Sequence, residues 1–522
     1  MRRATSPLPS PVSLLAGLTA SAVLCLGVVG PAHAGGSDEQ AIDTPRPVGV
    51  SLSDTERTLD RAASALEGRP PSGSDERVEA TLALRDLFVA RRSLGEDDVR
   101  EADRLLARPT DGASDPYGDG YTTSETKACA AHVCVHWVRS GADAPPDDAW
   151  AKKTLSVMEQ VWKHHIGTLG YRKPAGDGSR GGNGKFDVYL KELGGQGLYG
   201  YCAPEGRVPG KPKQASGFCV LDDDFAASQF NRPPIESLRV TAAHEFFHAI
   251  QFAYDYTEDP WLLESTATWI EERFADDVND NRNYLKYGQA GRSKKSLDLF
   301  DPSGLAHYGN WVFWEFLSER YGNAIVRKVI ERTGTGGGLP DDYSTQALRK
   351  VLKRKGGLPK VYAAFAAANT HPKGSYEEGA HFPGIAPVKK AALRSADPRV
   401  TFATKVNHLA AKTVKFKPAK LKAKKWQLKV KVRAPGSATA PAASVLVVRD
   451  NGTLQRRPIT LDKRGKGSRT LAFSSRKVRA VTVTVANAST RYSCNTGSGF
   501  ACEGRPLDQR EAFKVTAEAV RG

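Results

Sequence analysis

The chain has 522 residues, 40% of them hydrophobic, and a formal net charge of +17. This length and apolar content exclude a disordered tail and predict about three domains. The basic excess favours anionic partners, but no nucleic-acid-binding motif accompanies it, so nucleic acid is not predicted as a partner.

The first 34 residues predict a signal peptide. Arg2 and Arg3 precede an apolar stretch, and Ala32-His33-Ala34 has the small-residue spacing of a signal peptidase site. Removing residues 1–34 lowers the formal net charge from +17 to +15, because two arginines and no acidic residue are lost. The apolar stretch is short for a membrane span. We therefore expect a secreted protein, extracellular or cell-wall associated, with no membrane span after signal removal.

The six cysteines that remain after this cleavage fall into close pairs. In an exported protein such pairs predict three local disulfides. Six cysteines allow 15 pairings, and the simplest joins Cys129 to Cys134, Cys202 to Cys219 and Cys494 to Cys502. The absence of a CxxC motif argues against a cysteine-based zinc site.

The pattern of apolar residues changes twice along the mature chain. Helical spacing dominates residues 35–125, which form a small N-terminal helical segment, either a propeptide or an integral cap. In residues 126–398, short strand-like runs such as 186–190 precede long helical patterns, as in an α+β catalytic domain. Residues 399–522 alternate, with Leu428, Val430 and Val432 on one face, which predicts an all-β, sandwich-like accessory domain. We expect a multidomain protein.

The lysine-rich face of this last domain has two interpretations. Lys429, Lys431 and Arg433 alternate with the apolar positions and point the other way. They either attach the protein to an anionic cell-wall polymer or simply keep the surface solvated.

A helix that begins at Pro233-Pro234 carries the motif HEFFH. Its two histidines, His244 and His248, are four residues apart and therefore project from one face, close enough to share a tetrahedral cation. Glu245, next to the first histidine, can reach a metal-bound water. Two imidazoles and an acid among phenylalanines would be costly to bury without a partner, so we predict a metal site.

A third protein ligand is expected on the next predicted helix. Asp259-Pro260 is suited to a helix start and precedes WLLESTATWIEE. Glu264, Thr268 and Glu271 lie at i, i+4 and i+7 and share one face. Glu264 is the predicted ligand of a single catalytic zinc ion, and either Glu271 or Thr268 could orient a ligand histidine.

These two helices resemble those of the gluzincins, the superfamily of thermolysin and the aminopeptidase-N-like enzymes. The second helix resembles the aminopeptidase pattern WLNEGFASFVE at Trp261, Leu262, Glu264, Ala267 and Glu271. More broadly, residues 126–520 resemble a poorly characterised set of secreted bacterial metallopeptidase-like proteins. The resemblance implies a gluzincin-like peptidase in which Glu245 is the general base for a zinc-activated water.

The sequence departs from the best-known relatives in two respects. Only 15 residues separate His248 from Glu264, where thermolysin-like and aminopeptidase-like enzymes have 18 or 19. The chain also lacks a plausible GxMEN exopeptidase motif, so an endopeptidase is favoured over an exopeptidase. Gln251 and Tyr254 stand where a metzincin would need glycine and histidine.

The oxyanion of the reaction needs a further donor. The segment that begins at His307 resembles the place where aminopeptidase-like relatives carry a catalytic tyrosine, which favours Tyr308, with His307 second. Tyr308 could instead be an ordinary packing residue at a helix start. Calcium is a further candidate cofactor, because the runs 176–187 and 275–283 place oxygen donors in turns, although neither has the EF-hand spacing.

The sequence therefore predicts a secreted zinc peptidase that acts on peptide or protein substrates. One alternative is a wall-binding or adhesive protein with a non-catalytic zinc site. The other is a metal-dependent amidase that acts on a non-protein substrate. The intact Glu245 argues against a purely structural site, which would need no acid at the second position of the motif.

Overall fold

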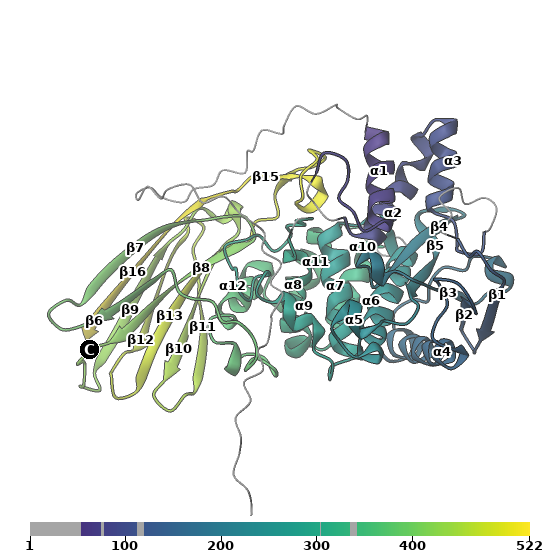
Figure 1. Cartoon of the computed structure of the whole chain (residues 1–522). Helices are drawn as coiled ribbons and strands as arrows, with labels where there is room; N and C mark the ends of the chain where they lie inside the picture. Colours follow the sequence, from purple (N-terminus) through teal and green to yellow (C-terminus); the bar gives the residue numbers. More distant parts are fainter. Residues whose placement is uncertain (1–53, 75–77, 112–119, 303, 335–341) are drawn as a thin grey trace, which may run out of the picture. The chain divides into compact units, whose positions relative to one another are not determined.

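The computed structural model describes residues 54–74, 78–111, 120–302, 304–334 and 342–522. The predicted signal peptide lies outside these residues. Residues 52–522 belong to one compact unit, and the boundaries predicted within it stay predictions. The described part is a mixed α/β structure with several sheets and a β-rich C-terminal region (Figure 1). Among the described residues, no helix is both long and apolar enough to cross a membrane.

The N-terminal segment is helical, as its apolar spacing predicts. It contains α1 (Asp54–Leu66), α2 (Ala80–Ala90) and α3 (Glu96–Leu105). Leu59 of α1 and Leu84 of α2 are buried in the same apolar core as the helices of the following part of the chain. Arg85 of α2 donates to the backbone oxygen of Glu258 at 2.8 Å. The segment therefore packs into the main core.

A five-stranded sheet follows, in the order β1-β2-β3-β5-β4. Its strands are β1 (Glu125–Cys129), β2 (Val133–Val138), β3 (Phe186–Lys191), β4 (Gly200–Val208) and β5 (Lys211–Asp222). The central strand β3 pairs in parallel with β2 and β5, whereas the outer pairs are antiparallel. β3 contains the predicted strand 186–190, which is apolar apart from Asp187 and buried throughout, as expected for a central parallel strand.

The HEFFH motif lies on α6 (Pro234–Asp255), one of the helices that make up much of residues 148–368. These helices are α4 (Asp148–Trp162), α5 (Ala227–Phe230), α6, α7 (Pro260–Phe274), α8 (Ala306–Gly309), α9 (Trp311–Tyr321), α10 (Ala324–Thr333), α11 (Ser344–Leu352) and α12 (Leu358–Ala368). Proline occupies the first position of both α6 and α7, as predicted. Asp259 precedes α7 but does not cap it with its side chain. Its Oδ1 instead accepts a hydrogen bond from the backbone N–H of Cys502 at 2.8 Å.

The C-terminal region consists of two larger sheets and one short strand pair. Their strands are β6 (Lys389–Leu393), β7 (Arg399–Val406), β8 (Ala410–Pro418), β9 (Trp426–Arg433), β10 (Pro441–Arg449), β11 (Leu454–Ile459), β12 (Lys466–Ala472), β13 (Val478–Asn487), β14 (Tyr492–Ser493), β15 (Arg505–Pro506) and β16 (Glu511–Arg521). The sheets have the orders β11-β10-β13-β8-β6 and β12-β9-β16-β7. Leu428 and Val430 of the second sheet share an apolar core with Val445 and Val481 of the first. The two sheets therefore pack face to face.

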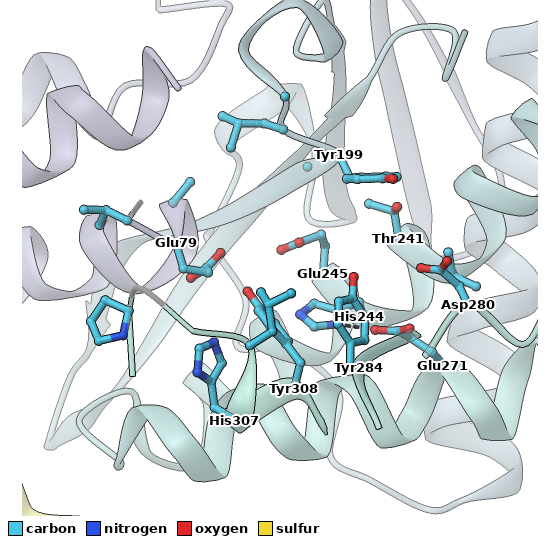
Figure 2. Close-up of a pocket in the computed structure, with 18 of the residues that line it drawn as sticks. Glu79, Tyr199, Thr241, His244, Glu245, Glu271, Asp280, Tyr284, His307 and Tyr308 are labelled. Carbon is cyan, nitrogen blue, oxygen red and sulfur yellow. Dashed lines mark hydrogen bonds and ion pairs between the residues drawn. The ribbon is translucent and has the colours of Figure 1, made fainter. Parts of the chain in front are cut away.

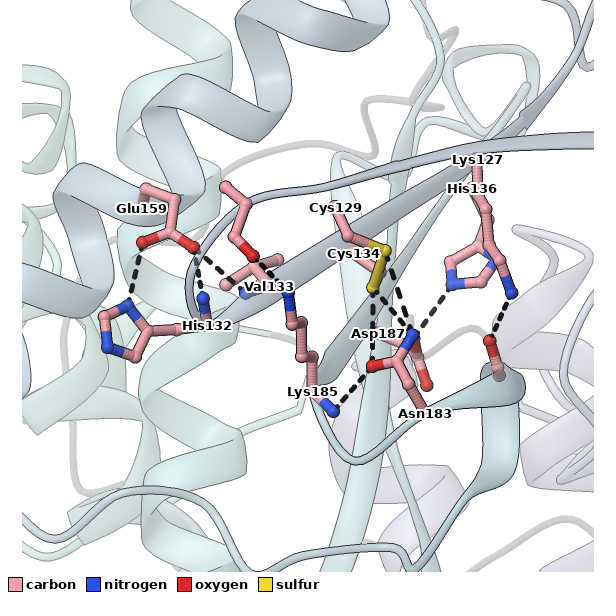
Figure 3. Close-up of a disulfide and its surroundings, with 12 residues drawn as sticks. Lys127, Cys129, His132, Val133, Cys134, His136, Glu159, Asn183, Lys185 and Asp187 are labelled. Atoms are coloured by element: carbon pink, nitrogen blue, oxygen red, sulfur yellow. Dashed lines mark hydrogen bonds and ion pairs between the residues drawn. A yellow bond between two sulfur atoms is a disulfide. The ribbon is translucent and has the colours of Figure 1, made fainter.

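The three predicted disulfides are confirmed: Cys129 with Cys134, Cys202 with Cys219, and Cys494 with Cys502. The first closes the turn between β1 and β2, where Asn183 contacts both sulfur atoms (Figure 3). The second joins directly opposed residues of β4 and β5.

Candidate metal centre

The predicted ligands lie together at the junction of α6 and α7. His244 and His248 are one turn apart on α6, and their ring centroids are 4.9 Å apart. Nε2 of His244 lies 3.4 Å from one carboxylate oxygen of Glu264, and Nε2 of His248 lies 3.5 Å from the other. One donor atom from each of the three residues lies within 4.8 Å of the other two. The short connection between α6 and α7 thus still brings Glu264 to the histidines.

The donor atoms of His248 and Glu264 lack hydrogen-bond partners. Nε2 of His248 and both carboxylate oxygens of Glu264 are buried and unpartnered within the described part of the chain. Leaving three polar atoms in this condition would be costly, because each has lost its contact with water. Two imidazole nitrogens and a carboxylate are a donor set that zinc binds with an open fourth position. The residues present therefore fit a catalytic zinc ion.

The other nitrogen of each imidazole is held by a neighbouring acceptor. Nδ1 of His244 lies 2.6 Å from Oε1 of Glu271, and Nδ1 of His248 lies 2.7 Å from Oε1 of Gln251. The Gln251 amide donates from Nε2 to the backbone oxygen of Leu263 at 3.0 Å. Because that oxygen can only accept, Oε1 of Gln251 must face His248, and Nδ1 of His248 must carry the proton. Nε2, which lies 3.5 Å from Oε1 of Glu264, then carries the free lone pair that a metal ligand needs.

The sequence predicted one of the two residues that hold the ligand histidines. Glu271 was one of its two candidates, and it contacts His244. The other candidate, Thr268, donates its hydroxyl to the backbone oxygen of Glu264 in its own helix. Gln251 was missed, although its position three residues after His248 on the same helix was a usable signal.

Glu245 lines the pocket beside the metal position (Figure 2). Its Oε2 accepts a hydrogen bond from the hydroxyl of Thr81 in α2 at 3.1 Å. The same hydroxyl oxygen accepts the backbone N–H of Cys202 at 3.0 Å, which leaves its proton for Glu245. Burial and the nearby carboxylate of Glu264 raise the pKa of Glu245 to about 7, although His244 opposes them.

The N-terminal segment contributes a second carboxyl to the pocket. Glu79 precedes α2 and accepts the backbone N–H groups of Thr81 at 3.0 Å and Leu82 at 2.7 Å. Its side chain lies in the pocket wall (Figure 2). Burial, and then the carboxylates of Glu264 and Glu245, hold its pKa well above the usual range. Sequence reasoning missed Glu79 and Thr81 because nothing local connects them to a motif that lies about 160 residues later.

Tyr308 and His307 both line the same pocket. The ring of Tyr308 lies 6.2 Å from that of His244, centroid to centroid. Burial and the carboxylate of Glu264 hold the pKa of Tyr308 well above its usual range, so its phenol keeps the proton and can donate it in a hydrogen bond. Burial lowers the pKa of His307 to about 4, which leaves that imidazole neutral near pH 7.

Arginines pair with most of the acids in the two runs predicted as calcium candidates. In residues 176–187, Asp177 and Asp187 accept from Arg108 at 2.6 and 2.7 Å, and Asp187 also contacts His136 (Figure 3). In residues 275–283, Asp277 pairs with Arg239 at 2.7 Å and Asp280 with Arg232 at 2.6 Å. Arginines thus neutralise four of the five aspartates in the two runs. The fifth, Asp276, is exposed and lies close to the carboxylates of Glu272 and Glu378, and we propose no cation there.

No family model and no curated protein matches the chain. One solved structure that it resembles is described as a novel family GH115 4-O-methyl-alpha-glucuronidase with specificity for decorated arabinogalactans. The two share 9% sequence identity at a TM-score of 0.13, over 55% of this chain and 38% of the glucuronidase. The chain thus spans little more than a third of that protein, and a TM-score this low carries no argument about fold or function.

Proposed function

We propose that this chain is a zinc-dependent peptidase of the gluzincin type, with His244, His248 and Glu264 as zinc ligands. The observation that carries the proposal is the convergence of one donor atom from each of these residues, together with the lack of a hydrogen-bond partner for Nε2 of His248 and both carboxylate oxygens of Glu264. Glu271 and Gln251 support it, because they hold both imidazoles in the tautomer that a metal ligand requires. The three disulfides agree with the proposed secretion.

A bound zinc ion would polarise the substrate carbonyl and lower the pKa of a water molecule. Glu245 lies where it can accept a proton from an attacking water and later return it to the leaving amine. Thr81 fixes one carboxylate oxygen of Glu245, which leaves the other to face the pocket. Tyr308 is the proposed donor to the oxyanion that develops on the substrate, because its phenol stays protonated.

The proposed substrate is a peptide bond within a chain, which makes the protein an endopeptidase. The missing GxMEN motif supports this choice. Glu79 supplies a pocket carboxyl that could contact a substrate amine, but two backbone N–H groups already bind it. We therefore expect a peptide with an N-acetylated amino terminus to be cleaved at the same rate as the same peptide with a free amino terminus.

The C-terminal region supports a second proposed role, attachment to an anionic wall polymer. On the outer face of its second sheet, Arg433 lies opposite Lys466 on one side and Lys514 on the other. Lys431 and Lys429 follow on the same face, and all five side chains are exposed. Like charges on directly opposed strand positions repel one another. A polymer of phosphate groups would relieve this repulsion.

The decisive experiment compares the wild type with Glu245→Gln, using the exposed Glu377→Gln as matched control. Zinc content and hydrolysis of casein and of an N-acetylated fluorogenic peptide are measured for each. We expect about one zinc per chain in all three and hydrolysis by all except Glu245→Gln. Bound zinc without any hydrolysis by the wild type would favour the adhesive or amidase alternatives. Absence of zinc would overturn the site itself.

A further inference from the structure

A second cluster of metal-type donors lies at the carboxyl ends of β3 and β5. Glu192 follows β3, Asp222 ends β5, and Asp223 comes directly after it. One carboxylate oxygen from each residue lies within 4.8 Å of the other two. Asp222 and Asp223 are 0% and 3% exposed. None of these residues takes part in the proposed zinc site.

Asp222 has ample hydrogen-bond partners. Its Oδ2 accepts the backbone N–H groups of Leu193 at 3.0 Å and Gly194 at 2.7 Å. Its Oδ1 accepts those of Phe225 at 2.6 Å and Asp224 at 3.3 Å. These four contacts hold the carboxylate of Asp222 in place. Two of them also hold the backbone of Leu193 and Gly194, which follow β3.

Asp223 is the member of the cluster whose burial has no evident compensation. Its Oδ1 is buried and has no hydrogen-bond partner, and no ion pair involves this residue in the described part of the chain. The nearby charges that act most strongly on it are acidic, those of Asp222, Asp224, Glu192 and Asp143, although Lys191 stands opposite Asp222 in the pairing of β3 with β5. Burial and then the charge of Asp222 raise the pKa of Asp223 to about 8. A buried carboxyl that has no hydrogen-bond partner at Oδ1 and lies within 4.8 Å of two other carboxylates calls for a cation.

We propose that Glu192, Asp222 and Asp223 bind a calcium ion. All three donors are oxygens, which hard cations prefer, and no histidine or cysteine belongs to the group. Calcium accepts irregular arrangements of carboxylates, carbonyls and waters at about 2.3–2.6 Å, whereas magnesium demands a near-ideal octahedron. The three carboxylates come from two separate strand ends, and the tolerant coordination of calcium suits such a set.

The proposed ion would stabilise one wall of the zinc pocket. Residues 192–199 connect β3 to β4, and Asp222 binds the backbone near the start of this connection. At its other end, the backbone N–H of Asp222 donates to the backbone oxygen of Tyr199 at 3.0 Å. Gly197, Leu198 and Tyr199 line the pocket. The calcium proposal stands on its own carboxylates and holds whether or not the pocket is a peptidase site.

The experiment measures calcium binding directly. Chelator-treated full-length protein is titrated with CaCl2 in a calorimeter, and its thermal unfolding is followed with and without CaCl2. The variants are Asp223→Asn, Glu192→Gln and, as matched control, Asp276→Asn, which alters an exposed acid in the carboxylate group of Glu272, Asp276 and Glu378. Parallel titrations use MgCl2.

We expect the wild type and Asp276→Asn to bind one calcium ion and to gain several degrees in Tm. Asp223→Asn should lose the binding heat and the Tm gain, while its Tm without calcium should be equal to or above that of the wild type, because a repelled carboxylate has been removed. Glu192→Gln should weaken calcium binding at least tenfold. It is a second ligand variant, so the proposal can still be tested if Asp223→Asn fails to fold. No calcium heat in the wild type, an unchanged response in Asp223→Asn, or equal binding of magnesium would overturn the assignment.

Discussion

The hydroxyl of Thr81 in α2 donates a hydrogen bond to the carboxylate of Glu245 in α6, across 164 residues of sequence. This contact makes the N-terminal helical segment part of the candidate site. A segment that holds the proposed general base is expected to be needed for activity.

Thr81→Val should lower kcat about 10- to 100-fold, because a hydrogen bond to a charged group contributes about 1.5–3 kcal/mol. Zinc content should not change, since Thr81 contacts no ligand. Thr81→Ser keeps the hydroxyl and should retain most of the activity. Steady-state kinetics on the fluorogenic peptide, with zinc analysis of each preparation, checks this. Equal kcat for Thr81→Val and wild type would show that the contact does not position Glu245.

Gln251→Met should weaken zinc affinity about 10- to 100-fold, as is typical when a contact behind a ligand is lost. Methionine has a similar length but cannot accept the Nδ1 proton of His248, so that imidazole is no longer held in one tautomer. Competition with a chromophoric chelator measures the affinity.

Thr266→Val is the matched control for Gln251. Its hydroxyl also contacts the Gln251 amide, at 3.0 Å, but the backbone oxygen of Leu263 remains to orient that amide. We expect little change in zinc affinity. An equal loss in both variants would point to general disturbance of the α6–α7 packing.

Asp259→Asn should reduce the pH dependence of stability. Burial, with a contribution from Asp298, raises the pKa of Asp259 in the folded protein to about 7, whereas an unfolded aspartate has a pKa near 4. Between these values the folded state binds more protons than the unfolded state, so the free energy of unfolding falls as pH rises from about 4 to 7. Asparagine removes this contribution and should flatten the slope.

Urea unfolding at several pH values between 4 and 7 measures the slope for wild type and Asp259→Asn. Glu258 and Asp298, together with the phenol of Tyr343, also face this position, so the difference between the two proteins is the relevant quantity. A steeper slope in Asp259→Asn would contradict the expected sign.

Replacing Arg433, Lys466 and Lys514 by serine should weaken binding to poly(glycerol phosphate) and reduce its salt dependence. The matched control replaces three exposed lysines of the α4 region, Lys152, Lys153 and Lys163, which changes the net charge equally. Co-sedimentation at several salt concentrations measures binding. If both triple variants lose binding equally, net charge and not the β9 face is responsible.

The sequence by itself determined the local features of this protein. Proline at two helix starts, alternation in β9 and the close cysteine pairs predicted elements and disulfides that the structure contains. The spacing of His244 and His248 placed both on one helical face, because a 3.6-residue period determines which side chains neighbour each other. The same period put Glu271 beside Glu264 and identified it as a contact for a ligand.

The tertiary structure alone decided which distant segments meet. Glu79 and Thr81 reach the pocket only because α2 packs against the main core, and no periodicity records such a contact. The carboxylates of Glu192, Asp222 and Asp223 come together because parallel strands end at the same edge of a sheet. Conversely, four of the five aspartates in the runs predicted as calcium candidates pair with Arg108, Arg232 or Arg239. Local composition cannot show whether an acid will meet an arginine or another acid, because that choice depends on packing between elements far apart in the chain.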